Sequence, residues 1–324
     1  MHDVPLWLWI AFAVTVVVAL AVDLLVNRKA HVIGLREAAV WSGVWVGLAV
    51  AFGVVVFLVV GTTAGVEYTT AWLLEKSLSV DNLFVFALIF GYFQVPREYQ
   101  HRVLFLGVLG ALVFRGLFLA AGVAVVSRFT AVMFVFAAFL FYSSYKILTK
   151  GEGSVDPGRS IAVRALRKVV TVRDDYAGNR FFLRENGTLV ATPLLAVVAA
   201  VEGADLIFAI DSVPAVLGVS SDIFIVYTSN AFAILGLRAL YFLLADLLDR
   251  FHHLSKGLAL ILAFIAVKLI LQASHEIIST SVPKVNALVS LAVIAAVLIT
   301  SVVLSLLRPA PPGSAESPSD GKAR

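Results

Sequence analysis

The chain has 324 residues, of which 60% are hydrophobic and 14% are charged, and its mean hydropathy is +0.97. This composition leaves too little polar surface for a water-soluble protein of this size and indicates an integral membrane protein. The formal net charge is only +4, and the absence of cysteine excludes disulfides and thiolate metal ligands within the chain.

Nine apolar runs follow one another along the sequence, and each is near the roughly 20 residues that a helix needs to cross a bilayer. They lie at about residues 5–26, 38–60, 67–93, 103–126, 130–149, 192–218, 223–247, 257–275 and 286–307. The first run lacks the basic flank of a secretory signal, so we expect it to remain in the mature protein. The sequence therefore predicts an all-α, polytopic membrane protein with about nine transmembrane helices.

Lys and Arg are concentrated in alternate connections between these runs. The first, third, fifth and seventh connections are basic, whereas the intervening ones contain only Arg128 and Lys284. Because short basic loops stay on the cytoplasmic side, this pattern predicts an external N-terminus and a cytoplasmic C-terminus.

The longest connection, about residues 150–191, opens with a glycine-rich stretch and continues into a short basic helix predicted at residues 159–170. Asn186-Gly187, which separates two short apolar segments, predicts a β-hairpin. We interpret the connection as a solvated cytoplasmic loop attracted to anionic lipid. Residues 308–324 form a tail rich in Pro, Ser and Gly, which we expect to be disordered.

Two of the apolar runs contain the same pattern of an acid, five residues and an aspartate. It reads Glu75-Lys-Ser-Leu-Ser-Val-Asp81 in the third run and Asp205-Leu-Ile-Phe-Ala-Ile-Asp211 in the sixth. A carboxylate in hydrocarbon is costly, so chains keep one there mainly for a function or for a fixed partner. The repeated pattern therefore marks the predicted functional site.

The two acidic runs also begin a longer internal repeat. Each is followed by a run with an arginine, Arg115 or Arg238, and then by a run with a lysine, Lys146 or Lys268. An odd number of crossings separates the two units, so they are predicted to be inverted three-helix repeats, as in many secondary transporters. The predicted organisation is: peripheral helices 1–66, first repeat 67–149, cytoplasmic loop 150–191, second repeat 192–275, last helix 276–307 and tail 308–324.

The acids of both units are predicted to form one metal site near the middle of the membrane. Its proposed ligands are Glu75, Asp81, Glu202, Asp205 and Asp211, supported by Asn82 and Ser212, with Arg115 and Arg238 as internal counter-charges. Residues six apart on an intact helix point about 120° apart. We therefore expect both acidic helices to be interrupted, near Asn82 and near Pro214.

Ligands that are all oxygen indicate a hard cation such as Mn²⁺, Mg²⁺ or Ca²⁺, and the lack of Cys disfavours copper(I). An alternative is that the charged residues form buried salt bridges that only fix helix packing. Two arginines against five acids would leave three acids unpaired, which makes this alternative costly.

Four longer motifs run through the same segments: Glu75-Lys-Ser-Leu-Ser-Val-Asp-Asn-Leu-Phe-Val85, Thr192-Pro-Leu-Leu195, Phe208-Ala-Ile-Asp-Ser-Val-Pro-Ala215, and the stretch from Phe224 to Tyr241. They resemble the TerC/Alx family of bacterial membrane proteins, and the resemblance extends to about residue 305. One departure is Ser220-Ser221-Asp222-Ile223, where family members often have Thr-x-Asp-Pro.

The resemblance implies tellurium resistance or manganese export, in a family that falls within the LysE-type transporter superfamily with its inverted three-helix repeats. It also implies that the five acids named above handle metal. The predicted location is the bacterial inner (plasma) membrane.

These features together predict an exporter of divalent cations, with Mn²⁺ in first place and proton uptake by some of the carboxylates as an added coupling. The expected partners are the metal ion, the lipid bilayer, and membrane or cytosolic proteins. No nucleic acid, bound cofactor or enzymatic activity is predicted.

Two other functions are compatible with parts of the sequence. One is a membrane anchor or scaffold that recruits tellurium-resistance or stress-response proteins through residues 150–191. The other is an intramembrane aspartyl protease, which fits poorly because Ala209-Ile210 precedes Asp211 where that group has Gly-x-Gly.

Overall fold

The computed structural model describes residues 3–26, 34–150, 161–173, 175–178, 180–185, 188–244 and 254–307. The predicted disordered tail, the glycine-rich stretch at 151–158 and the Asn186-Gly187 turn lie outside the described residues. The helices are α1 (Leu6–Val26), α2 (Leu35–Val59), α3 (Thr62–Tyr92), α4 (Arg97–Arg128), α5 (Val132–Lys150), α6 (Ile161–Val169), α7 (Pro193–Val219), α8 (Ile223–Ile234), α9 (Leu237–Leu244), α10 (Leu254–Ile277) and α11 (Ala287–Leu307). Two strands, β1 (Phe182–Glu185) and β2 (Thr188–Ala191), form an antiparallel hairpin.

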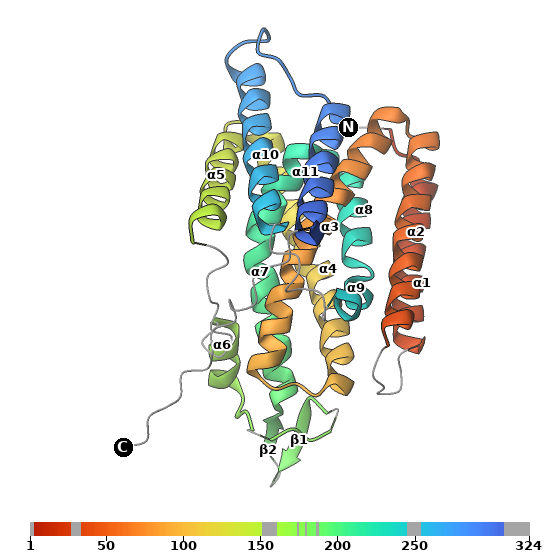
Figure 1. The fold of residues 1–324 in the computed structure, drawn as a ribbon, viewed down its shortest axis with the longest axis vertical. Coiled ribbons are helices and arrows are strands. Elements are labelled where there is room, and N and C mark those ends of the chain that lie inside the picture. Colours follow the sequence, from red (N-terminus) through yellow and green to blue (C-terminus); the bar gives the residue numbers. More distant parts are fainter. Residues whose placement is uncertain are drawn as a thin grey trace.

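The long helices lie roughly along the longest axis of the molecule, with α6 and the hairpin at one end (Figure 1). Seven spans in the described chain are long and apolar enough to cross a bilayer, and α7 adds an eighth if its two bent halves are counted together. The prediction of an integral, multi-pass helical membrane protein is confirmed. The ninth predicted transmembrane helix is α3. It is long enough to cross a bilayer, but it contains the charged residues Glu67, Glu75, Lys76 and Asp81 and is not among these spans.

The helices of the two predicted repeats pack against each other in pairs. Helix α3 contacts α8, α4 contacts α7, and α5 contacts α10, while α3 and α7 also touch. Helices α1 and α2 lie on one flank, where α2 packs against α3 and α9. Many large apolar side chains of α1, α2 and α11 are exposed, which suits a surface that faces lipid.

Helices α4 and α7 run in the same direction, because their contacts advance together along both helices. A Cβ added at successive glycines of α4 would meet α7 at increasing positions, namely Gly107 with Val201, Gly110 with Glu202, and Gly122 with Val213. Glycine thus allows α4 and α7 to approach closely over several turns. Two of the predicted functional acids of α7, Glu202 and Asp205, lie in this interface.

The connection between α5 and α7 is folded against the bundle. The predicted basic helix and hairpin are confirmed as α6 and β1–β2. However, Val163 of α6 is buried, Ala162 lies against Gly203 of α7, and the Tyr176 hydroxyl donates to the Phe93 carbonyl at 2.6 Å. Burial raises the pKa of Tyr176 to about 12, so this hydroxyl stays a donor at neutral pH. The interpretation as a loop solvated throughout is therefore wrong for this part.

Asp222, in the turn between α7 and α8, caps α8. Its carboxylate accepts from the backbone N–H of Phe224 at 3.0 Å and from that of Ile225 at 3.4 Å. An N-cap carboxylate satisfies backbone donors that the helix leaves free. The turn is therefore formed without the proline that is frequent after this aspartate in the family that the sequence resembles.

The run predicted as one span at residues 223–247 is broken into α8 and α9 at Leu235-Gly236. Gly236 has φ +83°, and a Cβ there would lie 2.6 Å from the Trp45 Cβ of α2. We expect Gly236→Ala to destabilise the protein by at least about 1–2 kcal/mol, the cost of a left-handed conformation for a residue with a side chain. Thermal unfolding in detergent measures this. Gly47→Ala is the control because a Cβ there meets nothing within 4 Å, and equal melting temperatures for the two variants would contradict the prediction.

Candidate cation site

Arg115 of α4 holds the acids of α3 and α7 together in the middle of the bundle. Its Nη1 lies 2.5 Å from Glu75 Oε2, its Nη2 lies 3.0 Å from Asp205 Oδ1, and its Nε lies 3.3 Å from Asp205 Oδ2. Arg115 and Glu75 are 0% exposed and Asp205 is 3% exposed. The contact with Asp205 is bidentate, the most directional form of an arginine–carboxylate pair. The structure thus brings together Glu75, Asp205 and Arg115 from the predicted site.

Asn82 completes the surroundings of the guanidinium. With its amide oxygen turned toward Arg115, Asn82 accepts from Nη2 at 3.0 Å and donates to the Leu78 carbonyl at 3.0 Å. This orientation follows from the hydrogen-bond partners, as is usual for an amide. The predicted supporting residue therefore contributes a neutral oxygen to the same centre.

Glu202 lies one helical turn before Asp205 on the same face of α7, as the spacing of three predicts. It is half-buried, and within the described chain its Oε2 has no hydrogen-bond partner. A Cβ added at Gly110 of α4 would overlap the Glu202 carboxylate. The Glu202 carboxylate therefore lies in a space that exists only because residue 110 is glycine. It is close to the group of Arg115, Glu75, Asp205 and Asn82, which we call the Arg115 cluster.

Several other oxygen atoms near these acids are buried and lack partners among the residues that the structure describes. They are Ser77 Oγ and Ser79 Oγ on α3, and Ser212 Oγ on α7. Buried polar atoms are nearly always hydrogen-bonded, and exceptions tend to mark functional positions. Ser212, predicted as a supporting residue, is thus buried with its hydroxyl available.

The remaining two acids, Asp81 and Asp211, belong to α3 and α7, but their side chains lie outside the described residues. Among the described side chains, no group of three or more acids or histidines is arranged to hold a metal ion. The five-carboxylate metal site accordingly stays a prediction.

The expected interruption is present in only one of the two acidic helices. Helix α7 bends by 42° between Pro193–Ala209 and Ser212–Val219, and Asp211 lies at the bend. Pro214 cannot donate a backbone hydrogen bond to residue 210, which frees that carbonyl and disfavours a straight helix. Helix α3 remains helical from Thr62 to Tyr92, so the interruption expected near Asn82 is absent.

Arg238, predicted as the second counter-charge of the acids, has a different partner. Its Nη2 forms an ion pair with the Asp23 carboxylate of α1, and both side chains are largely buried. This ion pair therefore holds Asp23 inside the bundle. Arg238 thus contacts a helix outside the predicted repeats, whereas Arg115 lies between α3 and α7.

Similarity to known proteins indicates the family of this chain. The model of the "Integral membrane protein TerC family" matches residues 60–310, which include every helix of the site. The chain belongs to the TerC family.

Three TerC relatives show the extent of the similarity. An uncharacterized membrane protein of Myxococcus xanthus is 42% identical over 96% of this chain and 96% of the relative. The putative membrane-bound redox modulator Alx of Escherichia coli K12 is 43% identical over 83% of the chain and 87% of the relative. The chloroplastic thylakoid membrane protein TERC of Arabidopsis thaliana is 46% identical over 81% of the chain and 66% of the relative. No solved structure matches the chain.

Two polar contacts in this TerC family member could not be read from local sequence. Lys76, next to Glu75, donates to the Ala233 carbonyl at 3.2 Å and so caps the end of α8 at its break. At the end of α3 opposite the hairpin, Glu67 accepts from Ser220 Oγ at 2.6 Å. The signals were a lysine inside an apolar run and an acid at its start, but neither indicates a partner.

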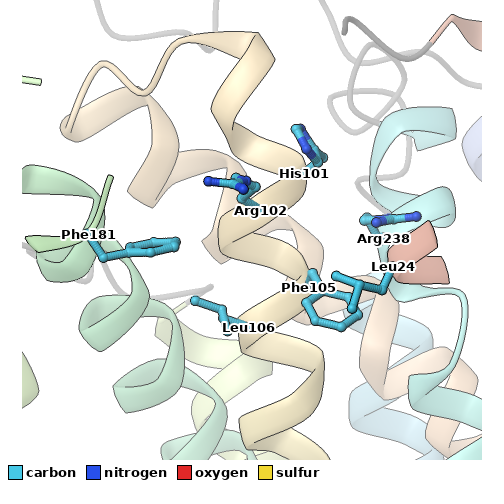
Figure 2. A pocket seen from close by; sticks show the side chains of 7 residues that line it. All are labelled: Leu24, His101, Arg102, Phe105, Leu106, Phe181 and Arg238. Atoms are coloured by element: carbon cyan, nitrogen blue, oxygen red, sulfur yellow. The ribbon is translucent and has the colours of Figure 1, made fainter. Parts of the chain in front are cut away.

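A cavity of about 530 Å³ lies away from the acid cluster, toward the end of the bundle that bears the hairpin. Figure 2 shows His101, Arg102, Phe105 and Leu106 along α4, with Phe181 on one side and Arg238 and Leu24 on the other. Two arginines and apolar side chains do not suit a divalent cation. We therefore place the candidate cation site at the Arg115 cluster.

Proposed function

We propose that this TerC family protein exports divalent metal cations, with Mn²⁺ as the favoured ion, by alternating access across the bacterial inner membrane. The observation that carries the proposal is the convergence of Glu75 and Asp205, from two different helices, on one buried guanidinium. Carboxylate and amide oxygens are the ligands that hard divalent cations prefer. The proposed ligands are Glu75, Asp81, Glu202, Asp205 and Asp211.

The packing supports two inverted repeats, α3–α5 and α7–α10, within nine spans that include α3. In these repeats α3 corresponds to α7, α4 to α8 and α5 to α10. The α3–α8 contact therefore corresponds to the α7–α4 contact, and the α5–α10 and α3–α7 contacts each correspond to themselves. All of these contacts exist. The parallel course of α4 and α7 also fits units that cross the membrane in opposite directions. With the basic loop inside, the N-terminus lies outside and the C-terminus in the cytoplasm.

The charges of the cluster support cation transport rather than a purely structural salt bridge. One guanidinium faces two carboxylates, which leaves one negative charge, and Glu202 lies one turn away without a hydrogen-bond partner for Oε2 among the described residues. Buried negative charge requires a cation or protons. Binding of the metal and uptake of protons on its release would satisfy this requirement in turn and couple export to the proton gradient.

The name of the Escherichia coli relative, a putative redox modulator, fits this proposal through an indirect route. These 324 residues contain no cysteine, so the chain itself has no thiol for dithiol–disulfide exchange. An altered level of a redox-active metal such as manganese would change the redox state of a cell without such chemistry.

Transport into inside-out membrane vesicles tests the proposal. Wild-type vesicles should accumulate Mn²⁺, and Asp81→Asn, Asp211→Asn and Asp205→Asn should each slow accumulation by about tenfold or more, the usual scale for weakening a metal site. Asp222→Asn is the matched control, because it removes an acid outside the site and asparagine also caps helices well. Wild-type rates in the first three variants would disprove the proposed site.

The same assay separates the second candidate function, a membrane scaffold. The observation in its favour is the exposed basic face of α6, formed by Arg164, Arg167 and Lys168. A scaffold requires no ion flux. Vesicles that contain folded wild-type protein and accumulate no divalent cation would therefore favour the scaffold.

A further inference from the structure

The oxygens around Arg115 form the kind of donor set that a hard cation requires. Glu75 Oε2, both carboxylate oxygens of Asp205 and the amide oxygen of Asn82 all face the guanidinium at 2.5–3.3 Å. A divalent cation binds such oxygens at about 2.0–2.6 Å. The guanidinium and a metal ion cannot occupy this position at the same time.

Arg115 also cannot give up its charge to make way for a metal, because arginine stays protonated in proteins. A metal that enters must therefore displace the whole side chain. Without either cation, Glu75 and Asp205 would face each other in a buried site, and like charges in a low-dielectric interior strongly disfavour that state.

A place for the displaced guanidinium exists on the same interface. Glu202 lies one turn from Asp205 on α7, and residues with this spacing have Cβ atoms about 5–6 Å apart. Its Oε2 has no partner in the part of the chain that the structure describes. Both Arg115 and Gly110, which leaves room for Glu202, belong to α4. A change of side-chain rotamer could thus carry the guanidinium from Asp205 to Glu202.

We propose that Arg115 is a tethered counter-cation: it occupies the acidic site when no metal is bound, moves to Glu202 when a divalent cation enters, and returns when the cation leaves. This inference rests on the proposed export function and changes its ligand set: in the metal-bound step Glu202 pairs with Arg115, and Glu75, Asp81, Asp205 and Asp211 are left to bind the metal. The return of Arg115 neutralises the empty site and lets the carrier change its orientation without cargo. Export in one direction needs that step, whereas exchange of one metal ion for another does not.

Arg115→Gln separates these two kinds of transport in reconstituted vesicles. Net Mn²⁺ export should fall by about tenfold or more, while exchange of radioactive Mn²⁺ for Mn²⁺ on the other side should stay within about threefold of wild type. Arg115→Lys keeps a positive charge and should retain more net export than Arg115→Gln. Equal losses of export and exchange in Arg115→Gln, or wild-type export in it, would overturn the proposal.

Stability measurements cover the case in which the variant folds poorly. Because Mn²⁺ can take the place of the guanidinium, it should raise the melting temperature of Arg115→Gln much more than that of wild type. Arg238→Gln is the matched control: it also removes a buried arginine, but its partner Asp23 lies outside the site, so Mn²⁺ should not restore its stability. An Arg115→Gln protein that unfolds equally with and without Mn²⁺ contradicts the proposal. If wild type shows neither export nor exchange, the proposed function itself is wrong.

Discussion

Replacement of Gly110 by alanine is expected to slow Mn²⁺ export by about tenfold or more, the scale at which displacing a group beside a metal site acts. A Cβ at this position would overlap the Glu202 carboxylate, so either Glu202 must leave its place or α4 and α7 must separate. Both changes disturb Arg115 and Asp205 in the same interface. Mn²⁺ accumulation in inside-out vesicles, corrected for the amount of folded protein, measures the effect.

Gly116→Ala is the matched control for this prediction. It lies on the same helix, and a Cβ there would be 3.8 Å from the Tyr227 ring, an ordinary contact. Alanine in place of glycine within a helix also stabilises it by about 0.5–1 kcal/mol. Export in Gly116→Ala should therefore remain near wild type. If both variants export Mn²⁺ at the wild-type rate, the position of Glu202 has no part in transport.

The largest loss of stability is expected when the ion pair between α1 and α9 is broken. Arg238→Gln leaves the largely buried Asp23 carboxylate without its ionic partner, and removing one member of a buried pair typically costs about 3–5 kcal/mol. We expect a correspondingly lower free energy of unfolding, measured by denaturant titration in detergent. Asp23→Asn should also be destabilising, since it leaves the Arg238 charge uncompensated.

A double-mutant cycle tests whether the loss arises from the pair itself. In Asp23→Asn/Arg238→Gln neither charge remains, so the double variant should be more stable than either single one. Additive losses would show that the two residues act independently and would contradict the ion pair as the cause. Mn²⁺ should not alter these values, because neither residue belongs to the candidate cation site.

Much of the architecture could be predicted from local sequence, because a bilayer requires long apolar helices and the charges between them are easily seen. The basic helix α6 and the hairpin followed from similarly local signals, a cluster of basic residues and an Asn-Gly turn. The bend of α7 also followed from its proline. The break between α8 and α9 was missed because Gly236 lies inside an apolar run, and only the close approach of Trp45 shows why glycine is needed there.

The partners of charged residues could be predicted only in part. Arg115 and Arg238 occupy similar positions in the two predicted repeats, yet Arg115 contacts Glu75 and Asp205, whereas Arg238 contacts Asp23, 215 residues away in sequence. Nothing in the local sequence distinguishes the two arginines. Their difference depends on which helix lies beside each one, and that is decided by the packing of α1 and α2 against one side of the bundle.

The attachment of the connection between α5 and α7 limits how far α3 and α7 can separate at the end of the bundle that bears the hairpin. Helix α6 packs on α7, whereas the Tyr176 hydroxyl donates to the Phe93 carbonyl at the end of α3. A chain segment fixed at both ends limits the distance between its two points of attachment. If α3 and α7 move apart at this end, the Tyr176 hydrogen bond must break or α6 and the hairpin must move with them, so the width of an opening there would depend on the connection between α5 and α7.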